Sequence, residues 1–128
     1  GPKDIQKNQV VLVKRENREK LFVSMDELEE KLPLIFDDIQ KSLYSKALAH
    51  REARTFKAET LDEMESILNT NPGFIKAMWC GDEECENAIK ERMAATARCI
   101  PFEQEKIGDK CVCCGKEAKQ LVYWGRAY

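Results

Sequence analysis

Long hydrophobic stretches are missing from this sequence. The longest ones are only a few residues, as at residues 10–13, so no segment is long enough to span a bilayer. A basic segment followed by an apolar one does not open the chain either, which leaves secretion without support. We therefore expect a protein without a membrane partner.

Histidine is almost absent, and the common nucleotide-binding and nucleophile motifs do not occur. The single histidine, His50, excludes a catalytic pair of histidines; it lies where a predicted helix fades, so we expect an exposed helical residue. No G-x-S-x-G motif, P-loop or dinucleotide fingerprint is present. The acidic run at residues 82–84 is explained by a nearby helix N-terminus, where negative charge is favourable. The sequence thus contains no self-contained active site.

A surplus of positive charge is also lacking. Lys and Arg number 21 against 23 Asp and Glu, a net charge of −2, which excludes nucleic-acid binding by bulk charge but not a local basic contact. The best place for such a contact is the turn at residues 14–20. Basic side chains outnumber acidic ones there: Lys14, Arg15, Arg18 and Lys20 against Glu16 and Glu19. The alternative is a solvated loop with ordinary lysines and arginines.

The sequence does contain enough apolar material for a core. Of its 128 residues, 43% are hydrophobic and 34% are charged, which fits one ordinary domain or two small ones. The chain opens with Gly1-Pro2 rather than methionine, so we expect a processed or tagged product, or a piece of something longer.

In the first half, the pattern predicts a hairpin followed by a long helix. Two runs rich in β-branched residues flank a polar turn, which predicts a hairpin over residues 9–23. Since a lone hairpin is marginal in water, these strands need a sheet that the sequence does not visibly supply. The spacing of Ser24 and Glu27 predicts a capping box for a helix that fades at residues 50–54 and should kink or break at Pro33. Its apolar face consists of Leu28, Leu32, Ile35, Ile39 and Leu43.

In the second half, helices and strands alternate. A capping box at Thr60 and Glu63 begins a short helix that ends at the helix breakers of residues 69–73. The remaining elements are a buried strand at 74–79, a helix at 83–95 with Ala88, Ile89 and Met93 inward, and strands at 98–102 and 120–124. The whole pattern predicts an α+β protein.

Six cysteines carry the clearest chemistry. Cys80 and Cys85 form a C-x4-C pair, and Cys111 and Cys114 form a C-x2-C pair followed by Gly115. Without a secretory signal, thiols or a metal are favoured over a disulfide scaffold. Two such pairs supply the four sulfurs of a tetrahedral zinc site, which would be structural because no position stays open for water or substrate. A glycine after the second pair suits a tight metal-binding turn.

The choice of ligands leaves alternatives. Cys113 competes with Cys114 as the partner of Cys111, but C-x2-C is the commoner spacing, and we interpret Cys113 as a non-ligand thiol. Cys99 lies in a strand-like run, which favours a small core hydrophobe. Instead of a metal site, the cysteines could be free buried thiols or include a redox C-x2-C pair. A redox pair usually lies at a strand-to-helix junction, whereas this pair precedes a strand.

Several motifs together resemble one family. They are residues 1–4, the hairpin segment 10–15 with Glu19 and Lys20, residues 38–40, residues 79–81, Cys85-Glu86, and residues 98–102, 111–115 and 124–128. This combination resembles prolyl-tRNA synthetase of the archaeal and eukaryote-like type, which carries an extra C-terminal zinc-binding domain. The resemblance covers essentially the whole chain. It implies that residues 1–23 are the hairpin end of an α/β anticodon-binding domain, 24–56 a connecting helix, and 57–128 a small α+β zinc-stapled domain.

The resemblance also implies a function. The parent would be a class II aminoacyl-tRNA synthetase that ligates proline to its tRNA using ATP. This chain would contribute to anticodon binding of tRNA(Pro) and to zinc-stabilised support, whereas ATP would bind the catalytic domain of the same polypeptide. A cytoplasmic, homodimeric parent without a DNA partner is implied as well. The alternatives are a stand-alone zinc-binding module for RNA or protein, and a thiol oxidoreductase that uses Cys111 and Cys114.

The family pattern implies roles for particular residues. Arg15 and Lys20 would contact the tRNA, and the terminal Tyr128 would dock against the catalytic domain. Where many relatives have an Asp-Thr-Gly turn, this chain has residues 16–18, Glu-Asn-Arg, so the resemblance does not extend to the geometry of the turn or to any base contact that the turn makes. Four cysteines match the structural zinc ligands of the family: Cys80, Cys85, Cys111 and Cys114.

Overall fold

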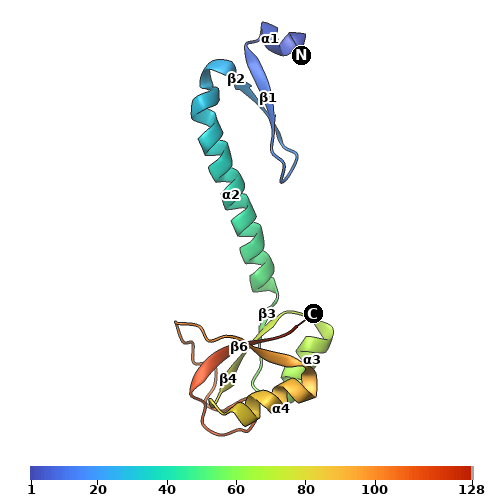
Figure 1. Ribbon diagram of the computed structural model, residues 1–128, viewed down its shortest axis with the longest axis vertical. Coiled ribbons are helices and arrows are strands. Elements are labelled where there is room, and N and C mark those ends of the chain that lie inside the picture. Colours follow the sequence, from blue (N-terminus) through green and yellow to red (C-terminus); the bar gives the residue numbers. More distant parts are fainter. Residues whose placement is uncertain (128) are drawn as a thin grey trace. The chain divides into compact units, whose positions relative to one another are not determined.

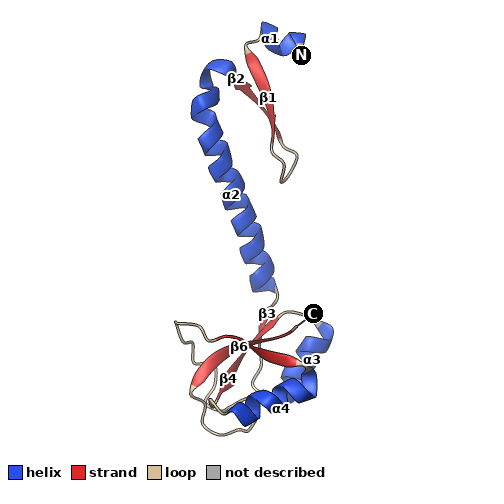
Figure 2. Ribbon diagram, viewed as in Figure 1, coloured by secondary structure: helices blue, strands red, loops and turns tan. Residues whose placement is uncertain are grey.

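The computed structural model describes residues 1–127, which belong to two compact units, Gly1–His50 and Arg51–Tyr128 (Figure 1). Two separate sheets and several helices confirm the predicted α+β class (Figure 2). None of the helices in residues 1–127 combines the length and the apolar character that crossing a membrane requires. The domain boundaries drawn after residues 23 and 56 stay a prediction.

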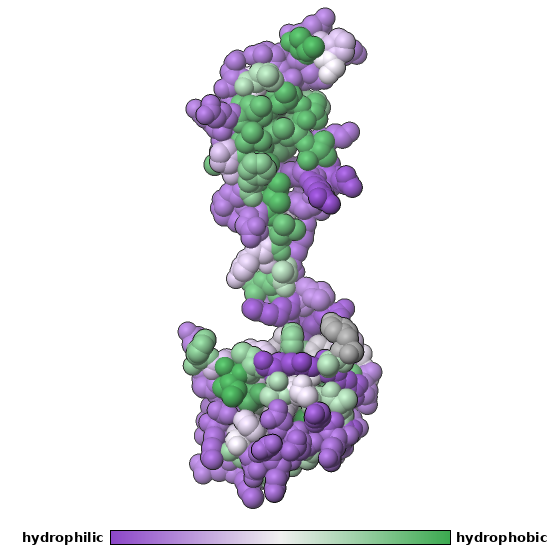
Figure 3. Space-filling view, in the orientation of Figure 1, coloured by the Kyte–Doolittle hydropathy of each residue, from purple (hydrophilic) through white to green (hydrophobic). Residues whose placement is uncertain are grey.

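The first unit contains the predicted hairpin. After a short helix α1 (Pro2–Gln6), strands β1 (Gln9–Val13) and β2 (Lys20–Ser24) pair antiparallel, with Val10 opposite Val23. Because side chains alternate across a strand, that pair lies on the partly buried face of the hairpin. The other face is bare: Val11, Val13 and Phe22 are 39%, 51% and 66% exposed. In Figure 3, apolar surface gathers over this unit. The hairpin is thus a two-stranded sheet with an uncovered apolar face.

The long helix α2 (Leu28–Ala53) is continuous through Pro33, so a break there is wrong, and a kink at Pro33 stays a prediction. A 3-10 turn, η1 (Met25–Glu27), leads into it, and the Ser24 hydroxyl accepts a hydrogen bond from the Asp26 amide at 3.3 Å. Proline removes one amide near the helix start, and the remaining turns keep their backbone bonds. The predicted apolar face is half-buried at Leu28, Leu32, Ile35 and Ile39, whereas Leu43 is exposed.

The second unit is built on a four-stranded sheet of order β3-β4-β6-β5. Its strands are β3 (Thr55–Lys57), β4 (Phe74–Trp79), β5 (Ala95–Cys99) and β6 (Gln120–Arg126), with β3 parallel to β4 and the other pairs antiparallel. The predictions for β4 and for the start of β6 are confirmed. The strand expected at 98–102 lies earlier, and β3 was not expected. Ala94 explains the shift, since its left-handed conformation (φ 55°) ends the preceding helix and lets β5 begin at once.

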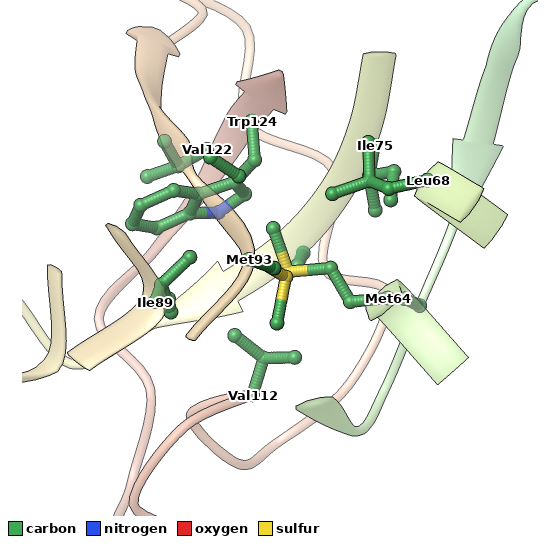
Figure 4. Packing of buried hydrophobic residues seen from close by; sticks show 11 residues of the cluster. Met64, Leu68, Ile75, Ile89, Met93, Val112, Val122 and Trp124 are labelled. Carbon is green, nitrogen blue, oxygen red and sulfur yellow. The ribbon is translucent and has the colours of Figure 1, made fainter. Parts of the chain in front are cut away.

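Helices α3 (Leu61–Thr70) and α4 (Glu83–Met93) cover one face of this sheet and enclose the core. Figure 4 shows the side chains that meet there: Met64, Leu68, Ile75, Ile89, Met93, Val112, Val122 and Trp124. Each large side chain buried in this way contributes about 1.5–3 kcal/mol to folding. Ala88 is exposed, contrary to prediction, because the buried face of α4 follows the i, i+4 series Cys85, Ile89 and Met93.

Candidate metal centre

Cys80 lies directly after β4, and Cys85 lies in the first turn of α4. Gly81 adopts φ 86°, a conformation that costs glycine nothing, and Asp82 then caps the helix. The indole Nε1 of Trp79 donates a hydrogen bond to the Asp82 carbonyl at 3.2 Å, which closes the loop over the turn. The chain reverses within this short loop and leaves the two sulfurs 3.6 Å apart.

Cys111 and Cys114 lie on a tight turn before β6. The Gly115 amide donates to the Cys111 carbonyl at 3.0 Å, and the Cys111 amide donates to the Lys116 carbonyl at 2.7 Å. Gly115 has φ 69°, as expected for the glycine that follows a metal-binding turn. A further bond of 2.9 Å, from the Val112 amide to a β4 carbonyl, fixes the turn against the strand that leads to Cys80. Backbone hydrogen bonds therefore place the second cysteine turn beside the strand that leads to the first cysteine loop.

The four sulfurs form one cluster. The Sγ atoms of Cys80, Cys85, Cys111 and Cys114 all lie within 4.8 Å of one another. The Cys114 and Cys80 sulfurs are 3.8 Å apart, and none of the four is in a disulfide. Four thiolates at about 2.3 Å from a zinc ion have edges of about 3.8 Å, so the spacing fits a tetrahedral ion of this size. Four sulfur donors leave no open coordination position, which suits a structural rather than a catalytic ion.

Burial raises the pKa values of these thiols, whereas hydrogen bonds from the backbone lower them. Burial raises the pKa of Cys80 and of Cys85 above the ordinary thiol range. Burial also acts to raise the pKa of Cys111, but backbone hydrogen bonds from Cys114, Cys113 and Cys80 outweigh it and lower that pKa to about 7. These backbone bonds favour the thiolate of Cys111, the form in which cysteine binds metal.

The two remaining cysteines lie outside the cluster. Cys113 is half-buried and packs against the cluster without being one of its four members. Cys99 is exposed, so its interpretation as a core residue is wrong. The reason is that β5 is the edge strand, and a register irregularity between Ala97 and Cys99 turns the end of the strand out of the core.

The predicted RNA contacts lie in the first unit, where Arg15 is on the hairpin turn and Lys20 is the first residue of β2. Arg15 and Lys20 are both exposed. Lys14, which the charge count grouped with them, is only 9% exposed and forms ion pairs with Glu19, at 2.8 Å, and with Asp38. The sequence gave no indication that Asp38 pairs with Lys14, because the two residues are 24 positions apart. His50 is exposed in α2, as predicted, and Tyr128 lies outside the described residues.

Sequence reasoning also missed the role of Trp79. Its indole both closes the first cysteine loop and meets the core, since it packs edge to face against the buried Trp124. The only indication of this role in the sequence was that Trp79 directly precedes Cys80. A side chain that contacts both the metal loop and the core links the stability of the two.

Known proteins resemble this chain over its full length. The family model "Prolyl-tRNA synthetase, C-terminal" matches residues 61–128. Proline--tRNA ligases from Clostridium novyi (strain NT) and Ruminiclostridium cellulolyticum are 61% and 59% identical over 128 residues, covering 100% of this chain and 27% of each of those proteins. The crystal structure of prolyl-tRNA synthetase from Cryptosporidium parvum complexed with L-proline and AMP matches with a TM-score of 0.91 at 35% identity, covering 100% of this chain and 28% of that one. The chain thus spans little more than a quarter of the length of the curated relatives that it matches, 27% of each.

Proposed function

The chain belongs to the prolyl-tRNA synthetase C-terminal family, and from this premise we propose that it is the C-terminal part of an enzyme that ligates proline to its tRNA using ATP. The family match over residues 61–128, which includes the four-cysteine cluster, carries the proposal. Because the chain spans 27% of the length of its ligase relatives, proline activation and ATP binding fall to the rest of that polypeptide. The parts of the chain are the hairpin end of the anticodon-binding domain (1–23), a connecting helix (24–56) and a zinc-stapled domain (57–128).

In this proposal, the zinc-stapled domain gives structural support. Cys80, Cys85, Cys111 and Cys114 would hold one zinc ion, and the sulfur spacing and the all-sulfur donor set favour that assignment. Bound zinc would supply stability and no reaction chemistry, since all four positions would be filled by protein. A structural zinc site contributes about 10–16 kcal/mol of apparent binding energy to the folding of a small domain.

The hairpin would contribute to the binding of tRNA(Pro). Arg15 on its turn and Lys20 at the start of β2 are exposed, and their side chains are free to meet phosphates or base edges. The uncovered apolar face at Val11, Val13 and Phe22 supports the view that further strands of the anticodon-binding domain complete this sheet. Tyr128 would dock against the catalytic domain of the same polypeptide, and the parent would be a cytoplasmic homodimer.

Proline-dependent exchange of pyrophosphate into ATP tests this division of labour. The 128-residue chain should show no exchange, and a polypeptide extended at its N-terminus to the length of the ligase relatives should show it. Exchange by the short chain alone would sink the proposal, as would a long polypeptide that exchanges with a different amino acid. A stand-alone binding module predicts that the extension makes no difference.

A further inference from the structure

Lys14 differs from the other cations of the hairpin turn. Its side chain is buried, whereas Arg15, Arg18 and Lys20 are exposed and form no ion pair with a carboxylate in residues 1–127. A buried ammonium is stable only when it is paired, and Lys14 has two partners. One is Glu19 on the turn, at 2.8 Å, and the other is Asp38 on α2.

The turn itself is closely bonded around Lys14. The Lys14 amide donates to the Glu19 carbonyl at 2.9 Å, and the Arg18 amide donates to the Lys14 carbonyl at 2.9 Å. Arg18 has φ 65°, a left-handed conformation that a non-glycine residue keeps only where its surroundings hold it. The Asn17 side-chain oxygen accepts from the Glu19 amide at 2.9 Å. The turn therefore has one defined conformation, with Lys14 at its base.

A second ion pair ties the same turn to the same helix. Lys46 lies about two turns beyond Asp38 on α2, and its Nζ is 2.9 Å from the Glu16 carboxylate, whose side chain is only 6% exposed. The turn is thus fixed to α2 at two separate places. The proximity of Asp38 and Glu19 raises the pKa of Lys14, and Lys14 lowers the pKa of both carboxyl groups.

We propose that Lys14 is a positioning residue for RNA binding: its ion pairs with Asp38 and Glu19 hold the turn in the conformation in which the three exposed cations meet the RNA backbone. The inference rests on the proposed function, in which the hairpin contacts tRNA. A turn that is ordered before binding loses less conformational entropy when it binds, and so binds more tightly with the same contacts. Lys14 itself, buried and neutralised, makes no RNA contact.

The helix offers a matched pair of aspartates for the test. Asp37 and Asp38 are adjacent and their side chains are equally exposed, at 60%, but Asp37 pairs with Lys41 of its own helix, at 2.6 Å. In the full-length enzyme, Asp38→Asn should raise the KM for tRNA in aminoacylation about three- to tenfold, because the turn loses its order. Asp37→Asn should leave that KM unchanged. Proline-dependent pyrophosphate exchange should be unaffected in both variants, since it does not involve the hairpin.

Further variants distinguish a positioning role of Lys14 from a role in stability alone, and test separately whether the hairpin contacts tRNA. Asp38→Glu keeps the charge and should restore the KM for tRNA. Hydrogen exchange of the amides of residues 15–19 should quicken in Asp38→Asn but not in Asp37→Asn or Asp38→Glu. Lys14→Met should reproduce Asp38→Asn. Unchanged exchange at the turn, or an unchanged KM in Asp38→Asn while an Arg15→Ala/Lys20→Ala double variant raises it, overturns the inference. If that double variant also leaves the KM unchanged, tRNA contact by the hairpin is wrong, and the inference fails with it.

Discussion

The indole rings of Trp79 and Trp124 meet edge to face, with centroids 6.2 Å apart and planes at 87°. Trp124 is fully buried in the core, and its Nε1 has no hydrogen-bond partner within residues 1–127. Trp79 directly precedes Cys80 and bonds to the loop between the first two cysteines. One aromatic contact therefore joins the core to the loop between Cys80 and Cys85, so a substitution on one side should alter the stability of the other.

Removal of metal should unfold the second unit. If the four cysteines bind zinc as proposed, its removal takes away the bonds that join the four sulfurs, and a small domain then loses a large part of its folding free energy. A strong chelator should red-shift the fluorescence of Trp79 and Trp124, reduce the far-ultraviolet circular dichroism, and lower the melting temperature. Added zinc should reverse all three. Unchanged spectra and melting temperature after the metal is removed would falsify the structural-zinc assignment.

Single cysteine substitutions should divide the six thiols into two classes. Cys→Ser at any of the four clustered positions should reduce bound zinc from one ion per chain towards none, since each substitution removes one of four donors. Cys99→Ser and Cys113→Ser are the matched controls, because these thiols lie outside the cluster, and both should keep one zinc. Zinc measured per chain by atomic emission decides the outcome. Loss of zinc in Cys113→Ser with retention in Cys114→Ser would reverse the choice of ligand.

Trp79→Phe should weaken the metal loop while keeping an aromatic ring against Trp124. The substitution removes the donor to the Asp82 carbonyl, and the loss of one such hydrogen bond costs about 0.5–1.5 kcal/mol. Zinc transfer to a chromophoric chelator should then be faster than in the parent chain, with circular dichroism of the zinc-loaded form unchanged. A Trp79→Phe variant that releases zinc at the parental rate contradicts a supporting role for the indole.

Sequence reasoning succeeded where the signal is local. The spacing of Cys80 and Cys85, and of Cys111 and Cys114, predicted four sulfurs that the fold does bring together. Short-range patterns likewise predicted the hairpin and α3, since capping and alternation depend on neighbours in the chain. These parts were predictable because few distant residues influence them.

The failures have physical causes that lie far along the chain or in backbone geometry. Cys99 has the surroundings of a buried strand residue in the sequence, but its strand is at the edge of the sheet. Alanine rarely adopts the left-handed conformation that ends α4 at Ala94, so residue type gave no stop signal. Lys14 looked like one more cation of a basic turn until the fold placed Asp38 beside it. Strand order and distant ion pairs are tertiary properties that one sequence does not encode locally.

The ion pairs of Lys14 should make the stability of the first unit depend on pH in a defined range. The pKa of Asp38 and of Glu19 is lowered from the ordinary values of 3.8 and 4.5, so their contribution is complete above these values and is lost as the pH falls through the folded-state values. The pKa of Lys14 is raised from 10.5, so its contribution is complete below that value and is lost at higher pH. The ion pairs should therefore be intact between about pH 5 and pH 10.

Comparison with Asp38→Asn measures this effect. The unfolding free energy of the first unit in the parent should exceed that of the variant at pH 6, and the difference should close as the pH falls below 3.8, the ordinary pKa of the carboxyl. Denaturant titrations of both chains across that range give the difference at each pH. A difference that stays constant down to the lowest pH would show that the ion pair makes no pH-dependent contribution.

Arg126 should stabilise the second unit by joining the ends of its two helices. Its guanidinium donates to the Met93 carbonyl at 2.7 Å, to the Leu68 carbonyl at 3.2 Å and to the Asn69 side chain at 2.8 Å. The two carbonyls belong to the last turns of α4 and α3, where positive charge is favoured by the helix dipole. One planar fork thus satisfies acceptors that an ammonium group has no means to reach together.

Arg126→Met should lower the unfolding free energy of this unit by about 1.5–3 kcal/mol, the sum of a few hydrogen bonds of which part is exposed to water. Arg126→Lys should recover less than half of that loss, because lysine keeps the charge but not the fork. The control is Arg98→Met. Arg98 lies on β5, and its guanidinium makes one hydrogen bond, of 3.2 Å, to the carbonyl of Gly125 on β6, the strand that also carries Arg126. Equal losses in Arg126→Met and Arg98→Met would contradict the special role of Arg126. Since Cys85 lies in the first turn of α4, loosening the far end of that helix should also speed zinc release, which the chelator assay measures in the same samples.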